Sequence, residues 1–233
     1  MKRASFQFIA LMSLLVTAQI GCAQSVPSST ASQGSSVNPQ VTRTVNGQVL
    51  TSADTPAIRL EFDRGFKYVG SQTFILYDVA SAEQHFFVDA DEQGRVKRFY
   101  WVQFEGYLPN NTHAYDYKSK KVVDLAGLDF VADAFPRNIK ANPGRSDSDG
   151  SRARAFLEGE GYRLASDDIL SQRLVHLVDK AKRNELMIIY IETLGGTGLT
   201  AADLSPGGKA AARWNEIAKG LLERALEKMK VTR

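Results

Sequence analysis

The sequence RVKRFYWVQFEGYL, at residues 95–108, carries the strongest β-strand signal in the chain. Successive side chains of a strand point to opposite faces of the sheet, so alternate residues share a face. One face would carry Phe99, Trp101, Gln103, Glu105 and Tyr107, and the other Tyr100, Val102, Phe104 and Leu108. Because both faces are aromatic, we expect each to be covered, at least in part, by other segments of the protein.

Further runs of β-branched and aromatic residues extend this pattern, at residues 57–62, 72–80, 83–90, 172–179 and 186–194. Gly, Asn, Asp or Pro residues bound these runs, as is typical of strands. The last run, LMIIYIETL, is apolar on both faces apart from Glu192, which indicates a buried strand. The sequence therefore predicts one shared sheet, mainly antiparallel.

Helix signals come later in the chain. Residues 204–230 contain Ser205 and Pro206, which suit a helix cap and a first helical position. An apolar stripe follows in steps of three or four residues, at Ala211, Trp214, Ala218, Leu221, Ala225 and Met229. Residues 124–135 and 148–161 are candidates for shorter helices. The expected fold class is α+β, with a mainly antiparallel sheet packed against a long C-terminal helix and one or two shorter helices.

Residues 1–21 have the layout of a signal peptide, with Lys2 and Arg3 followed by the apolar run FQFIALMSLLVTA and then small residues. Two cleavage patterns overlap after this run, which is too short for a membrane-spanning helix. GCA before Gln24 fits ordinary signal removal and would discard Cys22. QIGC at 19–22 resembles the lipobox of bacterial lipoproteins, although Gln19 stands where an aliphatic residue is usual. That resemblance implies that Cys22 becomes the lipid-modified first residue of the mature chain.

Residues 22–55 are rich in Ser, Thr, Gln, Gly and Pro and hold few large apolar groups. Such a segment cannot bury enough surface to offset the entropy of ordering it, so we expect a flexible tether. A single α+β domain would follow at residues 56–233. A tether favours lipid anchoring through Cys22, with the domain facing the periplasm; a soluble periplasmic or secreted protein is the alternative.

Composition and spacing exclude several classes of site. A formal charge of +3, from mixed acids and bases, lacks the clustered basic footprint of a nucleic-acid binder. A single cysteine allows neither an internal disulfide nor a cysteine-rich metal site. His85, His113 and His176 lie in separate segments without the spacing of a metal motif. We predict neither a metal nor a cofactor, and G-x-S-x-G is absent from the sequence.

The candidate ligand-binding residues come from two of the expected strands, and they are Trp101, Gln103, Glu105, Tyr107, Tyr190 and Glu192. A few polar groups set in an apolar wall are what a small-molecule pocket needs. An ordinary half-exposed sheet face, with Gln103 and Glu105 in water, is the other interpretation. If Glu192 is buried, it needs a partner such as Arg98, Arg173 or a tyrosine hydroxyl.

These observations favour a non-enzymatic protein of the bacterial cell envelope that binds a small amphiphilic molecule or an envelope protein partner. The alternative is an exported hydrolase in which Glu105 converges with Glu192 or His85 as an acid/base pair. The sequence shows isolated reactive groups, whereas catalysis needs converging ones. Separation of Glu105 from Glu192 onto opposite sheet faces would remove this site.

Overall fold

The computed structural model describes residues 40–119 and 121–233. The expected signal peptide at 1–21, the expected lipidation site Cys22 and the part of the expected tether before residue 40 lie outside the described residues. The described residues form mostly antiparallel sheet, with 45% of them in strands and 17% in helices.

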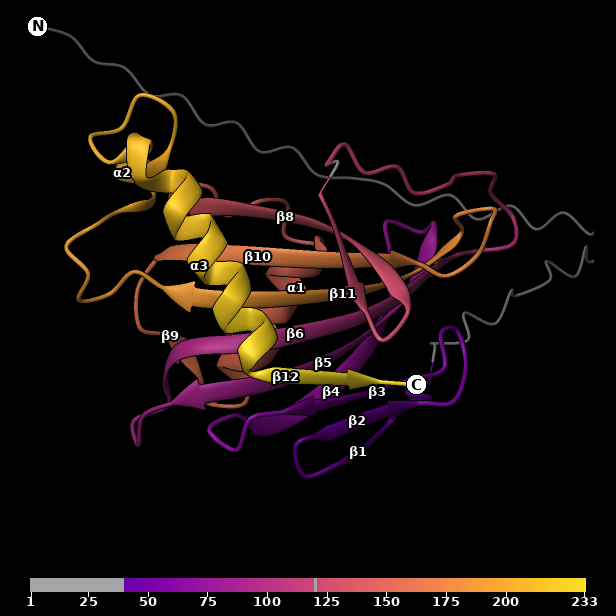
Figure 1. The fold of residues 1–233 in the computed structure, drawn as a ribbon. Helices are drawn as coiled ribbons and strands as arrows, with labels where there is room; N and C mark the ends of the chain where they lie inside the picture. The colour runs from indigo at the N-terminus through magenta and orange to yellow at the C-terminus, as the bar shows by residue number, and fades with distance from the viewer. Residues whose placement is uncertain (1–39, 120) are drawn as a thin grey trace, which may run out of the picture. The chain divides into compact units, whose positions relative to one another are not determined.

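The smaller of two sheets has four strands in the order β1-β2-β3-β12, with all neighbours antiparallel. Its strands are β1 (Thr44–Asn46), β2 (Val49–Ser52), β3 (Ile58–Phe62) and β12 (Met229–Thr232). Val231 of β12 pairs with Leu60 of β3, so the last strand of the chain joins the first ones (Figure 1).

The larger sheet runs in the order β4-β5-β6-β11-β10-β8-β7, and these neighbours are antiparallel. Its strands are β4 (Lys67–Leu76), β5 (Ala80–Ala90), β6 (Arg95–Tyr107), β11 (Asn184–Thr193), β10 (Asp168–Leu177), β8 (Leu128–Asn138) and β7 (Val122–Leu125). The short β9 (Arg163–Leu164) pairs with the start of β6 in parallel. The strand predicted at 95–108 is therefore present as β6, flanked by β5 and β11.

Both faces of the larger sheet are buried, as the aromatic pattern of β6 predicts. On one face, Tyr100 and Tyr190 belong to a cluster that also contains Leu60 of the smaller sheet. On the other face, Trp101 and Ile189 belong to a second cluster with residues of the first helix. Alternate side chains of β6 and β11 therefore pack into two separate hydrophobic cores.

The helices are α1 (Asp149–Gly159), α2 (Ala201–Leu204), the 3-10 turn η1 (Ala211–Arg213) and α3 (Trp214–Glu227). The helix predicted at 148–161 is confirmed as α1, where the Ser148 hydroxyl accepts a hydrogen bond from the Ser151 amide. Figure 1 shows α1 and α3 on opposite sides of the larger sheet. Within the described part of the chain, no helix has the length and apolar character needed to cross a membrane.

The expected α+β class with a long C-terminal helix is wrong. The predicted segment 204–230 is interrupted at η1, the helix that follows is the fourteen-residue α3, and the chain from Met229 onward is a strand. Leu221 and Ala225 do belong to the first cluster, so part of the apolar stripe is buried. Gly207 and Gly208 precede the break, and glycine is a poor helix former.

The helix predicted at 124–135 is also absent. The segment forms a hairpin in which Leu125 of β7 pairs with Leu128 of β8. The two loop residues, Ala126 (φ 57°) and Gly127 (φ 79°), have the left-handed conformation of a type I′ turn. This turn matches the twist of antiparallel strands, and it outweighs the local helical pattern.

The expected tether extends too far along the chain. Residues 44–52 form β1 and β2, and Leu50 is fully buried opposite Leu60 of β3. This hairpin carries few apolar residues, so its contribution to the core depends on partners far away in the sequence. The folded part therefore begins before residue 56, where the sequence placed its boundary.

Candidate functional site

A cavity of about 770 Å³ lies between the larger sheet and α1, on the side of the second cluster. Strands β6, β11 and β10 supply its floor, α1 one wall, and residues 139–148 part of its rim. Its apolar lining includes Phe99, Trp101, Ile169, Ile189, Ile191 and Leu157. The volume falls within the range of pockets that hold small molecules.

The strand register brings these apolar side chains together. Trp101 of β6 pairs with Ile189 of β11, and Ile191 pairs with Ser171 of β10. Paired residues on neighbouring antiparallel strands project to the same face of the sheet. Ala153, one turn of α1 before Leu157, closes the cavity from above and is 3% exposed.

Two polar groups interrupt the apolar lining. Ser171 is 3% exposed, and its hydroxyl makes no hydrogen bond to another described residue. The Asp149 carboxylate accepts a hydrogen bond from the Gly150 amide alone among described groups. Burial raises the pKa of Asp149, and the charges of Arg173 and Arg137 oppose that shift. Each group has hydrogen-bonding capacity to offer a bound molecule.

The rim of the cavity is basic. It carries the cationic residues Arg137, Lys140, Arg145, Arg154 and Arg163, against the carboxylates of Asp149, Glu158 and Asp167. Arg145 is neutralised by Asp147 and lies over the ring of Tyr77. The other four cations form no ion pair with a described carboxylate. Two large apolar side chains at the rim, Tyr77 and Phe135, are exposed to solvent.

Of the predicted ligand-binding residues, Trp101 lines this cavity. The other predicted residues of β6 lie beside it in a buried chain of amides. Gln72 donates to Gln84 at 2.8 Å, Gln84 to Gln103 at 2.7 Å, and Gln103 to Glu105 at 2.5 Å. The Trp101 ring nitrogen also donates to Gln103. The chain satisfies polar groups that would otherwise be costly to bury.

Two tyrosines donate hydrogen bonds to carboxylates at the end of this run of hydrogen bonds. Tyr115 donates to Glu105 at 2.8 Å, and Tyr117 donates to Glu185 at 2.5 Å. Glu105 and Glu185 are direct partners across β6 and β11. Burial raises the pKa of Glu105, and burial together with the nearby Glu105 charge raises the pKa of Glu185 to about 8. The half-buried Tyr107 stacks on Tyr115 with ring centroids 4.4 Å apart.

The sequence reasoning missed Glu185. It stands next to Leu186 at the start of the apolar run of β11, and its position one residue before that run looked like a strand end. Its 3% exposure follows from the cover supplied by Tyr117, which comes from a segment far away in the sequence.

Tyr190 and Glu192 lie on the opposite face of the larger sheet from Glu105. Tyr190 donates to Glu192 at 2.6 Å, and the Arg224 guanidinium of α3 binds the same carboxylate at 2.8 and 2.7 Å. A tyrosine hydroxyl is among the partners expected for Glu192, and Arg224 adds a second. Glu105 and Glu192 do not converge, so the hydrolase alternative lacks its pair of carboxylates.

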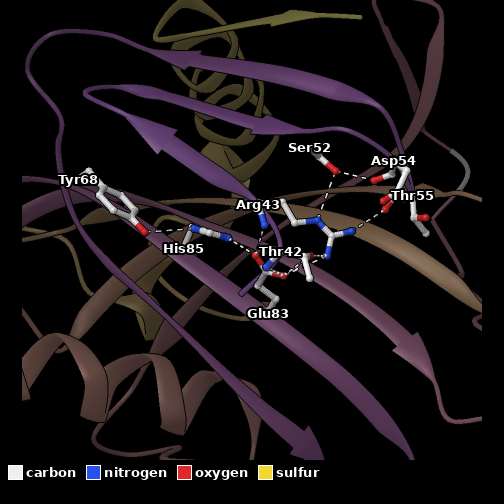
Figure 2. Close-up of polar contacts among 8 residues, drawn as sticks. All are labelled: Thr42, Arg43, Ser52, Asp54, Thr55, Tyr68, Glu83 and His85. Atoms are coloured by element: carbon white, nitrogen blue, oxygen red, sulfur yellow. Dashed lines mark hydrogen bonds and ion pairs between the residues drawn. The ribbon is translucent and has the colours of Figure 1, made fainter. Parts of the chain in front are cut away.

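His85, the other proposed acid/base partner of Glu105, forms its contacts with other residues. Figure 2 shows His85 between Tyr68 and Glu83, with ring-nitrogen distances of 3.3 and 2.8 Å to their oxygens. Glu83 also accepts hydrogen bonds from the backbone and side chains of Thr42 and Arg43. Against its burial, the hydrogen bond with His85 and those from Arg43 and Thr42 lower the pKa of Glu83 to about 2. The cluster joins the first described residues to β5. His85 itself is fully buried, so its ring is not accessible to a substrate.

Metal-ligating groups do not gather elsewhere in the described part of the chain. Among residues 40–119 and 121–233, no three His, Cys, Asp or Glu side chains are placed to hold a metal ion. The ring of His113 lies tilted against Tyr107, and that of His176 lies tilted against Phe130.

Comparison with known proteins identifies no relative. The chain matches no protein-family model, no curated protein and no solved structure.

Proposed function

We propose that this chain is an exported, lipid-anchored protein of the bacterial cell envelope that binds a small amphiphilic molecule in the cavity beneath α1. The observation that carries the binding function is the cavity itself. Its floor is mostly apolar, its volume is about 770 Å³, and the Ser171 hydroxyl in that floor makes no hydrogen bond to another described residue. An apolar cavity with few polar groups is the usual form of a small-molecule site.

The rim supports an amphiphile over a purely apolar ligand. Tyr77 and Phe135 are exposed where the apolar floor meets solvent, and unpaired cations stand beside them. A molecule with an apolar body and a polar head would cover the exposed rings and keep its head in the charged zone. Apolar transfer contributes about 25 cal/mol for each Å² buried, so a single alkyl chain is sufficient for measurable affinity.

The envelope location is supported by the sequence. Residues 1–21 have the layout of a secretory signal, and Cys22 ends a lipobox-like QIGC. Each acyl methylene that enters a bilayer contributes about 0.8 kcal/mol, so an acylated Cys22 would hold the domain at a membrane. The localisation test is Cys22→Ser, which should move the protein from the membrane fraction to the soluble fraction. Wild-type protein found soluble with Gln24 as its first residue would contradict the anchor.

Binding can be measured through the tryptophan that lines the cavity. The chain has two tryptophans, and Trp101 contacts the cavity whereas Trp214 belongs to α3. We expect dodecanol to change the fluorescence of the full chain carrying Cys22→Ser, which removes the site of acylation. The change should persist in a Trp214→Phe version and saturate with one ligand per chain. No saturable change in either version would contradict the proposed binding.

A pair of alanines on α1 gives a matched control for the location. Ala153 is 3% exposed and lines the cavity, whereas Ala155 is exposed on the other side of the helix. Ala153→Phe should place a ring inside the cavity and block dodecanol binding, and Ala155→Phe should leave binding unchanged. Melting curves of both variants separate loss of the cavity from loss of the fold. Equal binding by both folded variants would place the ligand elsewhere.

A further inference from the structure

We infer that the bound amphiphile has an anionic head, a carboxylate or a phosphate, and that Arg137 receives it. This inference rests on the proposed function, and it adds the chemical class of the ligand and the residue that selects it. Arg137 belongs to β8 and lines the cavity at its rim.

The guanidinium of Arg137 is fixed in place without being neutralised. Its Nε and Nη2 donate to the Asn142 carbonyl oxygen at 3.2 and 2.6 Å. Gly144 (φ +75°) passes so close that a Cβ there would lie 3.2 Å from Nη2. No described carboxylate pairs with Arg137, and Nη1 makes no hydrogen bond to a described residue. A positioned guanidinium with unused donors is suited to bind carboxylate or phosphate oxygens.

None of the other described cations of the rim is both held in place by hydrogen bonds of normal length and without an ion-pair partner. Arg145 is bound at 3.0 and 2.7 Å by the carboxylate of Asp147, so its charge is already compensated. Lys140 and Arg163 are exposed, and their side chains make no hydrogen bond or ion pair with a described residue. Arg154 makes one long hydrogen bond, 3.4 Å, to the Ile139 carbonyl. Among the rim residues, Arg137 is the cation that is both held and unpaired.

Asp149 contributes a carboxylate whose negative charge opposes the positive charge of Arg137. Its carboxyl lines the same cavity and lies within electrostatic range of Arg137. An ionised Asp149 repels an anionic head and attracts a cationic one. If the head of the ligand is anionic, the two substitutions should change its affinity in opposite directions. Arg137→Gln should weaken binding, and Asp149→Asn should tighten it.

The test compares dodecanoate, dodecyl phosphate and dodecanol, which share one alkyl chain and differ in the head. In the full chain carrying Cys22→Ser, both anions should bind more tightly than dodecanol, and the tighter of the two identifies the head group. Arg137→Gln should weaken the anions roughly ten- to a hundredfold, the range of one or two charge-assisted hydrogen bonds. It should change dodecanol binding by less than about twofold.

The control is Arg64→Gln, which removes one positive charge at an exposed residue that does not line the cavity. It should leave the affinity for both anions unchanged. Equal affinity of the wild type for dodecanoate, dodecyl phosphate and dodecanol would overturn the inference while leaving the cavity function intact. So would an equal loss of all three ligands in a folded Arg137→Gln chain. Failure of dodecanol itself to bind would contradict the proposed function instead.

Discussion

Replacement of Glu185 by glutamine should remove much of the dependence of stability on pH. Glu185 is 3% exposed, accepts a hydrogen bond from Tyr117 at 2.5 Å and faces Glu105 across the neighbouring strand. The nearby cation, Arg173, is already paired with Asp133. Burial and the Glu105 charge therefore raise the pKa of Glu185 to about 8.

The sign follows from proton linkage. The folded chain keeps the Glu185 proton to about pH 8, whereas the unfolded chain releases it near the ordinary value of 4.5. This contribution to stability is complete below about pH 4.5, declines as the pH rises, and is lost above about pH 8. At ~1.4 kcal/mol for each pKa unit the upper limit is roughly 5 kcal/mol. Water entry on ionisation reduces the cost of a buried charge, so we expect a loss of about 2–4 kcal/mol.

The assay is urea unfolding of wild type and Glu185→Gln at about pH 5 and about pH 9. The glutamine keeps an oxygen to accept the Tyr117 hydrogen bond and cannot ionise, so the variant should lose less stability between the two pH values. Glu105, whose pKa is also raised, accounts for the dependence that remains. Glu160→Gln, at an exposed carboxylate, is the control and should behave as wild type. The same pH dependence in Glu185→Gln and wild type would refute the reasoning.

Three further outcomes are expected. Glu83→Ala should lower the free energy of unfolding by about 3–5 kcal/mol in urea titrations, because the half-buried Arg43 and the fully buried His85 both lose the carboxylate that they contact; a change under about 1 kcal/mol would contradict this. A chain that begins at Thr55 should melt below one that begins at Gln40, because it lacks β1 and β2, and equal melting temperatures would show the hairpin to be dispensable. Leu221→Ala, at a fully buried site, should cost about 2–5 kcal/mol by the same titration, and no loss would place Leu221 outside the core.

The central strands were predictable from the sequence because their signal is local. The run at 186–194 is apolar on both faces, and it forms β11 (Asn184–Thr193) beside β6. The C-terminal segment was not predictable in the same way. The strand at Met229–Thr232 exists because Val231 meets Leu60, a contact that no window of sequence contains. The hairpin around Ala126 similarly depends on two left-handed residues that a helical pattern obscures.

The candidate site was predictable at one residue. Trp101 was singled out from the alternation of β6, and it lines the cavity. The unusual polar residues beside it, Gln103 and Glu105, find hydrogen-bond partners in Gln84 and Tyr115, which lie on other segments. Arg137 lies near the end of β8 and Asp149 begins α1, and it is folding that brings both to one rim.

Photoaffinity labelling tests the central claim, that an amphiphile occupies the cavity beneath α1, most directly. A dodecanoate analogue with a diazirine at the far end of its chain would be bound to the full chain carrying Cys22→Ser, irradiated and mapped by peptide mass spectrometry. We predict label on peptides that contain Leu157 or Ile189, with loss of that label in Ala153→Phe and its retention in Ala155→Phe. Label on α3 (Trp214–Glu227), or labelling that Ala153→Phe does not alter, would contradict the account.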